Sequence, residues 1–317
     1  MNLIDMHCDT FWLMMREKTE GLHKNHLAVD IEKMKWAGSL AQFFACFIYM
    51  DEFSGEDRYT KAYEHALDMI SYAKGQIHDC AGDIALATCF ADLQRNREHG
   101  LMSAFLTIEE GGILEDDMSR LEHLYQEGIR LMTLTWNHEN CIGFPNSRDA
   151  SVMQKGLKPF GVEVVERMNQ LGMLIDVSHL SDGGFWDVLQ YSQKPIVASH
   201  SNCRSLCNQP RNLSDEMIRA LANQGGVVGI NLYPYFVRES GVVSAEDIAD
   251  HVAHMYQVGG VDVIGIGTDF DGFDEGVSDI TQIGQMSLLY DIVKRRGFTE
   301  RQMEKFWCKN ILRLING

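Results

Sequence analysis

Short apolar stretches, rich in β-branched and aromatic residues, alternate along the chain with longer amphipathic stretches. Eight apolar stretches have the length of a buried strand: 2–7, 40–48, 103–110, 129–136, 173–179, 195–200, 226–233 and 261–269. Helical spacing of apolar residues predicts helices over 58–75, 116–127, 160–171, 182–192, 214–224, 244–258, 281–295 and 299–315. This alternation indicates parallel strands that are joined by helical crossovers.

The predicted strands are apolar almost throughout, which is typical of a sheet that helices cover on its outer face. A closed (β/α)8 TIM barrel is the simplest such arrangement, and a doubly wound open sheet is the alternative. Residues 49–102 are too many for an ordinary connection, so we expect an insertion over one end of the barrel. C-terminal helices close the chain, and because there is no obvious linker we expect residues 1–317 to form a single barrel domain.

The charge balance excludes some partners. The chain has 28 Lys and Arg against 45 Asp and Glu, a net charge of −17, which argues against nucleic acid and anionic membranes as partners. We find neither a secretory leader nor a run of 18 apolar residues, so we expect a cytoplasmic protein without a membrane span. The eight cysteines form no CxxC pair, and we expect free thiols.

Polar side chains recur at the C-terminal ends of the predicted strands. They are His7, Asp9, Glu109, Glu110, Trp136, Asn137, His138, His179, His200 and Asp269. In a (β/α)8 barrel these strand ends converge on one mouth, where catalytic groups are found. Imidazoles and carboxylates together are suitable ligands for one or two zinc-like ions. The pattern therefore predicts a metal site at the mouth.

Strand geometry refines this prediction. The side chains of His7 and Asp9 share one strand face because the strand period is two. Asp269 shares its face with two glycines at 265 and 267, which we expect to leave room for a substrate or metal. Only one of the adjacent residues Glu109 and Glu110 can face inward, and the spacing does not choose between them.

The remaining histidines lack matching partners at strand ends. They are His23, His26, His65, His78, His99, His123, His251 and His254, and we expect them at the surface. His251 and His254 lie three residues apart on one helix face, which could bind a metal. Solvated neighbours at that spacing are routine on helices, so we favour the surface interpretation.

Seven ordered motifs resemble those of the renal (membrane) dipeptidases, a branch of the amidohydrolase superfamily. They are DMHCDT (5–10), IEEGG (108–112), GIRLMTLTWN (128–137), GMLIDVSH (172–179), ASHSN (198–202), PRNLSDE (210–216) and GIGTDFDG (265–272). The resemblance covers nearly the whole length of the chain. It implies a barrel with two Zn²⁺ ions that hydrolyses dipeptides.

The resemblance also assigns metal ligands. It places one Zn²⁺ on His7 and Asp9 and the other on His179 and His200. It selects Glu110, directly before two glycines, as the carboxylate that bridges the two ions together with a hydroxide.

The resemblance assigns roles to two further residues, and the chain departs from the family pattern at one position. Arg211 is expected to receive the C-terminal carboxylate of the substrate, and a guanidinium suits this task because it can pair with a carboxylate through two hydrogen bonds. Asp269 is expected to shuttle the proton. Family members have a substrate-contacting histidine where this chain has Trp136, and His138 is the candidate to replace it.

The predicted function is therefore a zinc-dependent dipeptidase, whose substrates include L-Xaa-D-Xaa dipeptides as the resemblance implies. The expected partner is a small dipeptide, and a homodimer is compatible with the family. The alternatives are another amidohydrolase, acting on an N-acyl amino acid, a cyclic amide or a lactone, and a non-catalytic metal-binding barrel. The presence of both Asp269 and Arg211 argues against the last of these, because a structural metal site needs neither.

Overall fold

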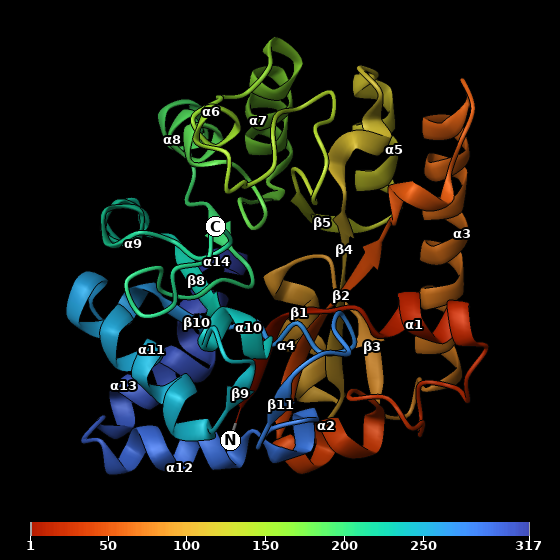
Figure 1. Ribbon diagram of the computed structural model, residues 1–317. Coiled ribbons are helices and arrows are strands. Elements are labelled where there is room, and N and C mark those ends of the chain that lie inside the picture. Colours follow the sequence, from red (N-terminus) through yellow and green to blue (C-terminus); the bar gives the residue numbers. More distant parts are fainter. Residues whose placement is uncertain (1, 317) are drawn as a thin grey trace.

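Eight parallel strands form a closed barrel in the computed structural model, which describes residues 2–316 (Figure 1). Around the ring they are β1 (Leu3–Cys8), β2 (Ser39–Phe47), β4 (Met102–Glu109), β5 (Ile129–Thr133), β6 (Leu174–Asp176), β7 (Val197–Ala198), β8 (Val227–Ile230) and β10 (Ile264–Ile266). The predicted (β/α)8 barrel is confirmed, and the open-sheet alternative is wrong. Each predicted strand is present, although several are shorter than the apolar stretch that indicated them.

Closure of the barrel depends on two strands near the N-terminus. β1 pairs with β10 through Asp5 and Ile266, and β2 pairs with both β1 and β4. The pairing of β4 places Glu109 opposite Phe47 of β2 and Thr133 of β5. A short extra strand, β3 (Ile84–Leu86), pairs with the beginning of β4. A separate two-stranded sheet is formed by β9 (Val242–Val243) and β11 (Val277–Ser278).

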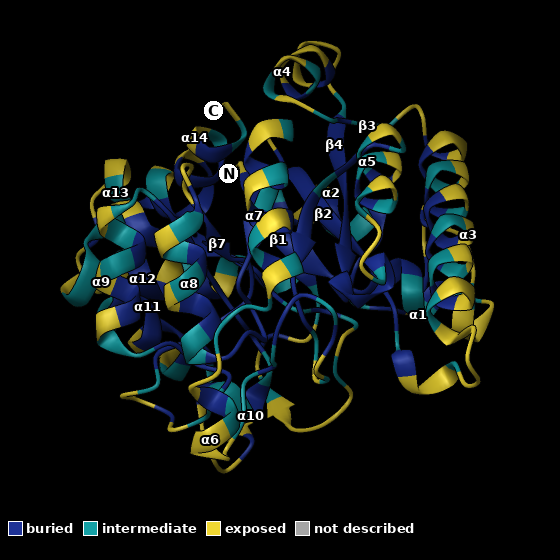
Figure 2. Ribbon diagram, turned by 90° about the horizontal axis from the view of Figure 1, so that it is seen from above, coloured by how far each residue is buried: buried dark blue, intermediate teal, exposed yellow. Residues whose placement is uncertain are grey.

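Helices surround the barrel and expose one face each, whereas the strands inside are buried (Figure 2). They are α1 (Thr10–Glu17), α2 (Ile31–Ala37), α3 (Arg58–Asp79), α4 (Phe90–Glu98), α5 (Met118–Gln126), α6 (Ala150–Met153), α7 (Pro159–Leu171), α8 (Asp182–Tyr191), α9 (Asp215–Asn223), α10 (Pro234–Val237), α11 (Ala245–Gly259), α12 (Ser287–Arg295), α13 (Glu300–Glu304) and α14 (Asn310–Asn316), with a π-helical turn at Lys305–Lys309. Ser214 and Ser244 begin α9 and α11 because their hydroxyls accept backbone N–H groups of the first turn.

The expected insertion at 49–102 consists of two parts. Its long helix α3 packs against α1 and β2 and is the crossover between β2 and β4. Only β3 and α4 are additional to the barrel pattern, and α4 packs against β3, β4 and α14 (Figure 2). The extra elements therefore lie at the end where the strands begin, away from the mouth.

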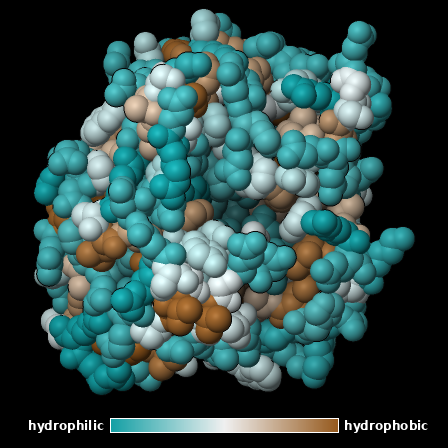
Figure 3. Space-filling model, viewed as in Figure 1, coloured by the Kyte–Doolittle hydropathy of each residue, from teal (hydrophilic) through white to brown (hydrophobic). Residues whose placement is uncertain are grey.

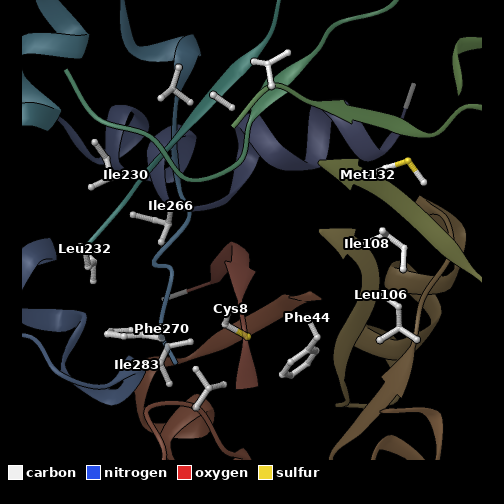
Figure 4. Packing of buried hydrophobic residues seen from close by; sticks show 14 of the residues in the cluster. Cys8, Phe44, Leu106, Ile108, Met132, Ile230, Leu232, Ile266, Phe270 and Ile283 are labelled. Carbon is white, nitrogen blue, oxygen red and sulfur yellow. The ribbon is translucent and has the colours of Figure 1, made fainter. Parts of the chain in front are cut away.

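Two hydrophobic clusters occupy opposite faces of the strands, because successive side chains of a strand point to opposite sides. The outer cluster joins strand residues such as Phe44 and Leu106 to the surrounding helices (Figure 4). The inner cluster includes Phe43, Phe105 and Leu314 of α14. Since Glu109 has the same parity as Phe105 along β4, its side chain continues the inner face toward the mouth.

The surface carries no sign of a bilayer segment. Within residues 2–316, no helix combines the length and the apolar character needed to cross a membrane. The face seen in Figure 3 is mainly hydrophilic, and its hydrophobic residues form small separate groups.

Candidate metal centre

Glu109 lies at the centre of the mouth and faces three imidazoles. Its Oε2 is 3.2 Å from His7 Nε2, while its Oε1 is 3.1 Å from His179 Nε2 and 3.5 Å from His200 Nε2. The four side chains come from the ends of β1 and β4 and from the segments that follow β6 and β7. All four residues are buried. Residues far apart in the sequence thus meet at the mouth, as the sequence pattern predicted.

Glu110 faces away from the imidazoles, so the expectation that it lies between them is wrong. It follows the last residue of β4, has a positive φ of 98°, and is itself buried. Its carboxylate accepts hydrogen bonds from Gly112 N at 2.7 Å, Asn140 Nδ2 at 2.5 Å and Trp136 N at 3.1 Å. These donors hold the loop after β5 against β4. Glu109 occupies the place that the family resemblance had assigned to its neighbour.

Two further carboxylates approach His7. Asp9 Oδ2 lies 3.3 Å from His7 Nε2, and Asp269 Oδ1 lies 3.8 Å from the same nitrogen. Ligand atoms of His7, Asp9 and Asp269 lie close enough to share one cation, as do those of His7, Glu109 and His200. The left-handed backbone of Asp269, with φ of 63°, is a conformation that non-glycine residues adopt mainly at constrained sites.

Neighbouring side chains orient His179 and His200. Asn137 Oδ1 lies 3.1 Å from His179 Nδ1, and Ser199 Oγ lies 2.7 Å from His200 Nδ1. Because Ser199 Oγ donates to Asp176 at 2.5 Å, it accepts the proton on His200 Nδ1. A hydrogen bond at Nδ1 leaves the Nε2 lone pair available for a metal ion.

The resulting arrangement fits a cation. The Nε2 atoms of His179 and His200 are 3.1 Å apart, and both face Glu109 Oε1. With Nδ1 protonated on each ring, three lone pairs converge without a proton between them, and a bound cation relieves their repulsion. Asp9 Oδ1 is also buried and has no hydrogen-bond partner among residues 2–316. Imidazole nitrogen and carboxylate oxygen are ligands of zinc and of other transition-metal ions.

Burial and charge set the protonation of these groups. Burial lowers the pKa of His179 to about 4, with a further contribution from Arg211, and burial with nearby His7 lowers the pKa of His200 well below its usual value. Burial opposes ionisation of Glu109, but the charge of His7 and the imidazole hydrogen bonds hold its pKa well below the ordinary range. Glu109 and Asp9 raise the pKa of His7 well above its usual value against the effect of burial, so of the three imidazoles only those of His179 and His200 are held neutral, the form that binds a metal ion.

The mouth also holds the expected shuttle and anchor. Burial raises the pKa of Asp269 to about 6, while Asn231 donates a hydrogen bond to its Oδ2 at 2.8 Å. Arg211 is buried, and it donates to Ser201 Oγ and to the carbonyl oxygen of His200, each at 2.9 Å. Its Nε has no hydrogen-bond partner among the described residues. Both groups therefore lie beside the imidazole cluster.

Trp136 and His138 lie beside the imidazole cluster, next to His179. The Trp136 ring is 6.2 Å from the His179 ring, and it also contacts Phe47 and Tyr49. His138 lies beyond Trp136, at a centroid distance of 5.8 Å, and its Nε2 is 3.4 Å from Asp51 Oδ1. Trp136 thus borders the imidazoles directly, and His138 stands behind it.

Two buried aspartates support the site and were not among the predicted metal ligands or catalytic residues. Asp5 accepts hydrogen bonds from the backbone and side chain of Thr268 at 2.8 and 2.7 Å. Asp176 accepts from Thr133 Oγ1 at 2.7 Å as well as from Ser199. Each aspartate follows an apolar pair in a predicted strand, in LIDMH and LIDVSH, shortly before a histidine. The two aspartates could have been predicted from this repeated sequence pattern.

Gly265 of β10 and Gly267, directly after this strand, do not open space for a ligand as expected. A Cβ atom at Gly267 would collide with the carbonyl oxygen of Ser199, and one at Gly265 would press on Val227. Gly229 of β8 meets the same Ser199 carbonyl. The glycines therefore allow neighbouring strands to approach closely, and the prediction that they leave room for a ligand is wrong.

His251 is buried, contrary to its expected place on the surface. Its Nδ1 accepts a hydrogen bond from the backbone N of Cys203 at 3.1 Å, and its Nε2 donates to the Val237 carbonyl at 3.0 Å. Burial lowers its pKa below the usual value. His254, on the same helix, pairs instead with Asp215 at 2.8 Å. The two histidines have separate partners and form no joint metal site.

Comparison with known proteins identifies the family. The model of the membrane dipeptidase family, Peptidase family M19, matches residues 1–317. The chain belongs to this family. It is accordingly a metallo-dipeptidase, and the cluster at the mouth is the candidate site for its metal ions.

Relatives of this M19 chain include a dipeptidase of Schizosaccharomyces pombe that is itself uncharacterised, 30% identical over 90% of this chain and 71% of its own length. An uncharacterised protein in the pqqA 5′ region of Klebsiella pneumoniae is 31% identical over 78% of this chain and 93% of its own.

Solved structures share the fold. A crystal structure of a metallopeptidase of family M19, dipeptidase AC, has a TM-score of 0.91 at 24% identity, covering 99% of this chain and 98% of its own. A metallopeptidase from Rhodobacter sphaeroides, liganded with a phosphinate mimic of L-Ala-D-Ala, has a TM-score of 0.88 at 24% identity and the same coverage.

Proposed function

We propose that this M19 enzyme is a zinc-dependent dipeptidase with a binuclear centre. His7, Asp9 and Glu109 Oε2 would hold one ion, and His179, His200 and Glu109 Oε1 the other. The observation that carries this proposal is the orientation of Glu109, whose two oxygens face separate groups of nitrogen ligands. Glu109 therefore takes the bridging role for which the resemblance had suggested Glu110.

Zinc ions bound here would supply two effects: a lower pKa for bound water, from about 15.7 to about 7, and polarisation of the scissile carbonyl. The protein's own groups would do the rest. Arg211 would pair with the C-terminal carboxylate of a dipeptide and so set the distance from that carboxylate to the scissile bond. Its buried guanidinium is already fixed by Ser201 and by the His200 carbonyl, which favours a single geometry.

Asp269 would move the proton. Its Oδ2 is held by Asn231, which leaves Oδ1 directed at the cluster, near His7 Nε2. At Oδ1 it would take a proton from the attacking water and deliver it to the leaving amine. Substrates would include L-Xaa-D-Xaa dipeptides, an inference supported by the family resemblance and by the L-Ala-D-Ala mimic bound to the Rhodobacter sphaeroides metallopeptidase.

The test compares substrates on one zinc-loaded preparation. We expect hydrolysis of L,L- and L,D-dipeptides, little hydrolysis of the same dipeptides with an amidated C-terminus, and loss of activity on chelation that added Zn²⁺ reverses. Metal analysis should give two zinc ions per chain. Faster hydrolysis of N-acyl amino acids, cyclic amides or lactones than of any dipeptide would replace this function with another amidohydrolase activity.

A further inference from the structure

A cavity of about 290 Å³ opens beside the metal centre, between the segment after β2 and the loop after β5. It is lined by Met50, Asp51, Arg58, Tyr59, Glu110, His138, Glu139 and Asn140. The cavity wall is connected to the centre through Trp136, whose backbone N donates to the Glu110 carboxylate and whose ring borders His179. None of the catalytic or anchoring roles proposed above uses it.

A series of contacts leads from Arg211 past the imidazoles to this cavity. Arg211 donates to the carbonyl of His200, whose ring lies against His179, which in turn borders Trp136. His138, on the cavity wall, lies beyond Trp136. A dipeptide whose carboxylate rests on Arg211 therefore directs its N-terminal residue toward this cavity.

The charges around the cavity are predominantly negative. The segment 50–57 contains four acidic residues and no basic one. Arg58 stacks on Tyr59, with its Cζ 4.7 Å from the ring centroid, and donates to the Tyr59 hydroxyl. Glu139 is paired with Lys158 at 2.8 Å. Asp51 lies near the imidazole of His138 and the hydroxyl of Tyr49, and it has no Lys or Arg partner among the described residues.

Glu110 cannot be the main counter-charge for a cationic group in the cavity, because its buried carboxylate already accepts three hydrogen bonds. Asp51 is the carboxylate at the cavity that remains available to a ligand. Its position is suited to a long side chain that passes Trp136 and ends in a cation, and the Trp136 ring would contact the apolar stem of such a side chain.

We propose that this cavity receives the side chain of the N-terminal residue of the substrate and favours Lys and Arg there, with Asp51 as the selecting carboxylate. The inference rests on the proposed dipeptidase function and adds its substrate class. In this proposal the enzyme selects between substrates at the cavity beyond Trp136 and not at Arg211.

The experiment measures kcat/KM of zinc-loaded enzyme for Lys-D-Ala, Arg-D-Ala, Leu-D-Ala and Glu-D-Ala. We expect the cationic substrates to exceed Glu-D-Ala by about tenfold or more, since a single favourable charge contact is of that order. Asp51→Asn should reduce the rates for Lys-D-Ala and Arg-D-Ala about fivefold and leave Leu-D-Ala nearly unchanged. Asp51→Lys should shift the preference toward Glu-D-Ala.

Glu56→Gln is the matched control, because it removes one negative charge from the same segment without lining the cavity. It should leave the preference intact. Equal rates for all four substrates, or equal effects of Asp51→Asn and Glu56→Gln, would overturn the inference while the dipeptidase function stands. Absence of hydrolysis for every dipeptide would instead overturn the proposed function and with it this inference.

Discussion

Buried histidines occur in two regions of this molecule, and their surroundings differ in kind. At His251 both ring nitrogens have complementary backbone partners, one donor and one acceptor. At the mouth, His179 and His200 have one partnered nitrogen each, and the other nitrogens converge on Glu109 within 3.5 Å. A buried imidazole whose two nitrogens both have hydrogen-bond partners holds elements of the fold together. Several acceptor atoms that face one another without a proton between them are instead stabilised by a bound cation.

The same contrast separates the adjacent carboxylates Glu109 and Glu110. Glu110 is satisfied by three neutral donors, and Glu109 by imidazoles alone. The comparison predicts that a neutral replacement of Glu109 will affect metal binding. A neutral replacement of Glu110 will instead affect the loop after β5.

Glu109→Gln should reduce bound zinc below two per chain and lower kcat/KM by about 10³-fold or more, since a metal centre supplies several kcal/mol to the transition state. Glu110→Gln should retain two zinc ions and lower the free energy of unfolding by about 1–3 kcal/mol, because its new amide group faces donors. Metal analysis, kinetics and urea unfolding of both variants measure these effects. Loss of zinc in Glu110→Gln, with retention in Glu109→Gln, would reverse the assignment.

Asp269→Asn should lower kcat about 10²- to 10⁴-fold, the usual contribution of a general acid–base group. Zinc content should stay at two per chain, because the ions would keep their imidazoles and Glu109. Steady-state kinetics and metal analysis on the same preparation check this. Turnover close to that of the unaltered enzyme would remove Asp269 from the proton path.

Ser199→Ala should weaken zinc binding about 10- to 100-fold, because the hydroxyl that orients His200 and links it to Asp176 is lost. Ser192→Ala is the control, since Ser192 is a buried serine that bonds to Asn169 away from the mouth. Competition with a chelator of known affinity gives both values. Equal zinc affinity in the two variants would show that the Ser199 hydroxyl does not tune the site.

His251→Gln should change how stability depends on pH. Burial lowers the pKa of His251 in the folded chain below 6.5, its usual value, which applies to the unfolded chain. Between the folded and the unfolded pKa, the unfolded chain therefore binds more protons than the folded one. The stabilisation is therefore complete above pH 6.5 and is lost as pH falls through the folded pKa. Urea unfolding at pH 8 and pH 5 should show a smaller pH difference for the variant. Identical differences for both proteins would mean that His251 does not titrate on unfolding.

Much of the fold could be predicted because its signals are local. Apolar stretches and helical spacing indicated the barrel strands and the covering helices, and parallel strands must bring their ends to one mouth. The short helices α1, α2, α4, α6 and α10 were not predicted, because helices of this length depend on tertiary packing more than on a periodic sequence pattern. β7 is only two residues long, since most of its apolar stretch packs without continuous pairing.

By itself the sequence determined the strand order, the gathering of His7, His179 and His200 at one mouth, and the fact that only one of two adjacent glutamates could face them. Only the tertiary structure decided that Glu109 is the one. Its direction depends on the register of β4 between β2 and β5, which places Glu109 opposite Phe47 and Thr133. A strand's period of two shows which residues share a face, but pairing with neighbouring strands decides which face lies inside the barrel.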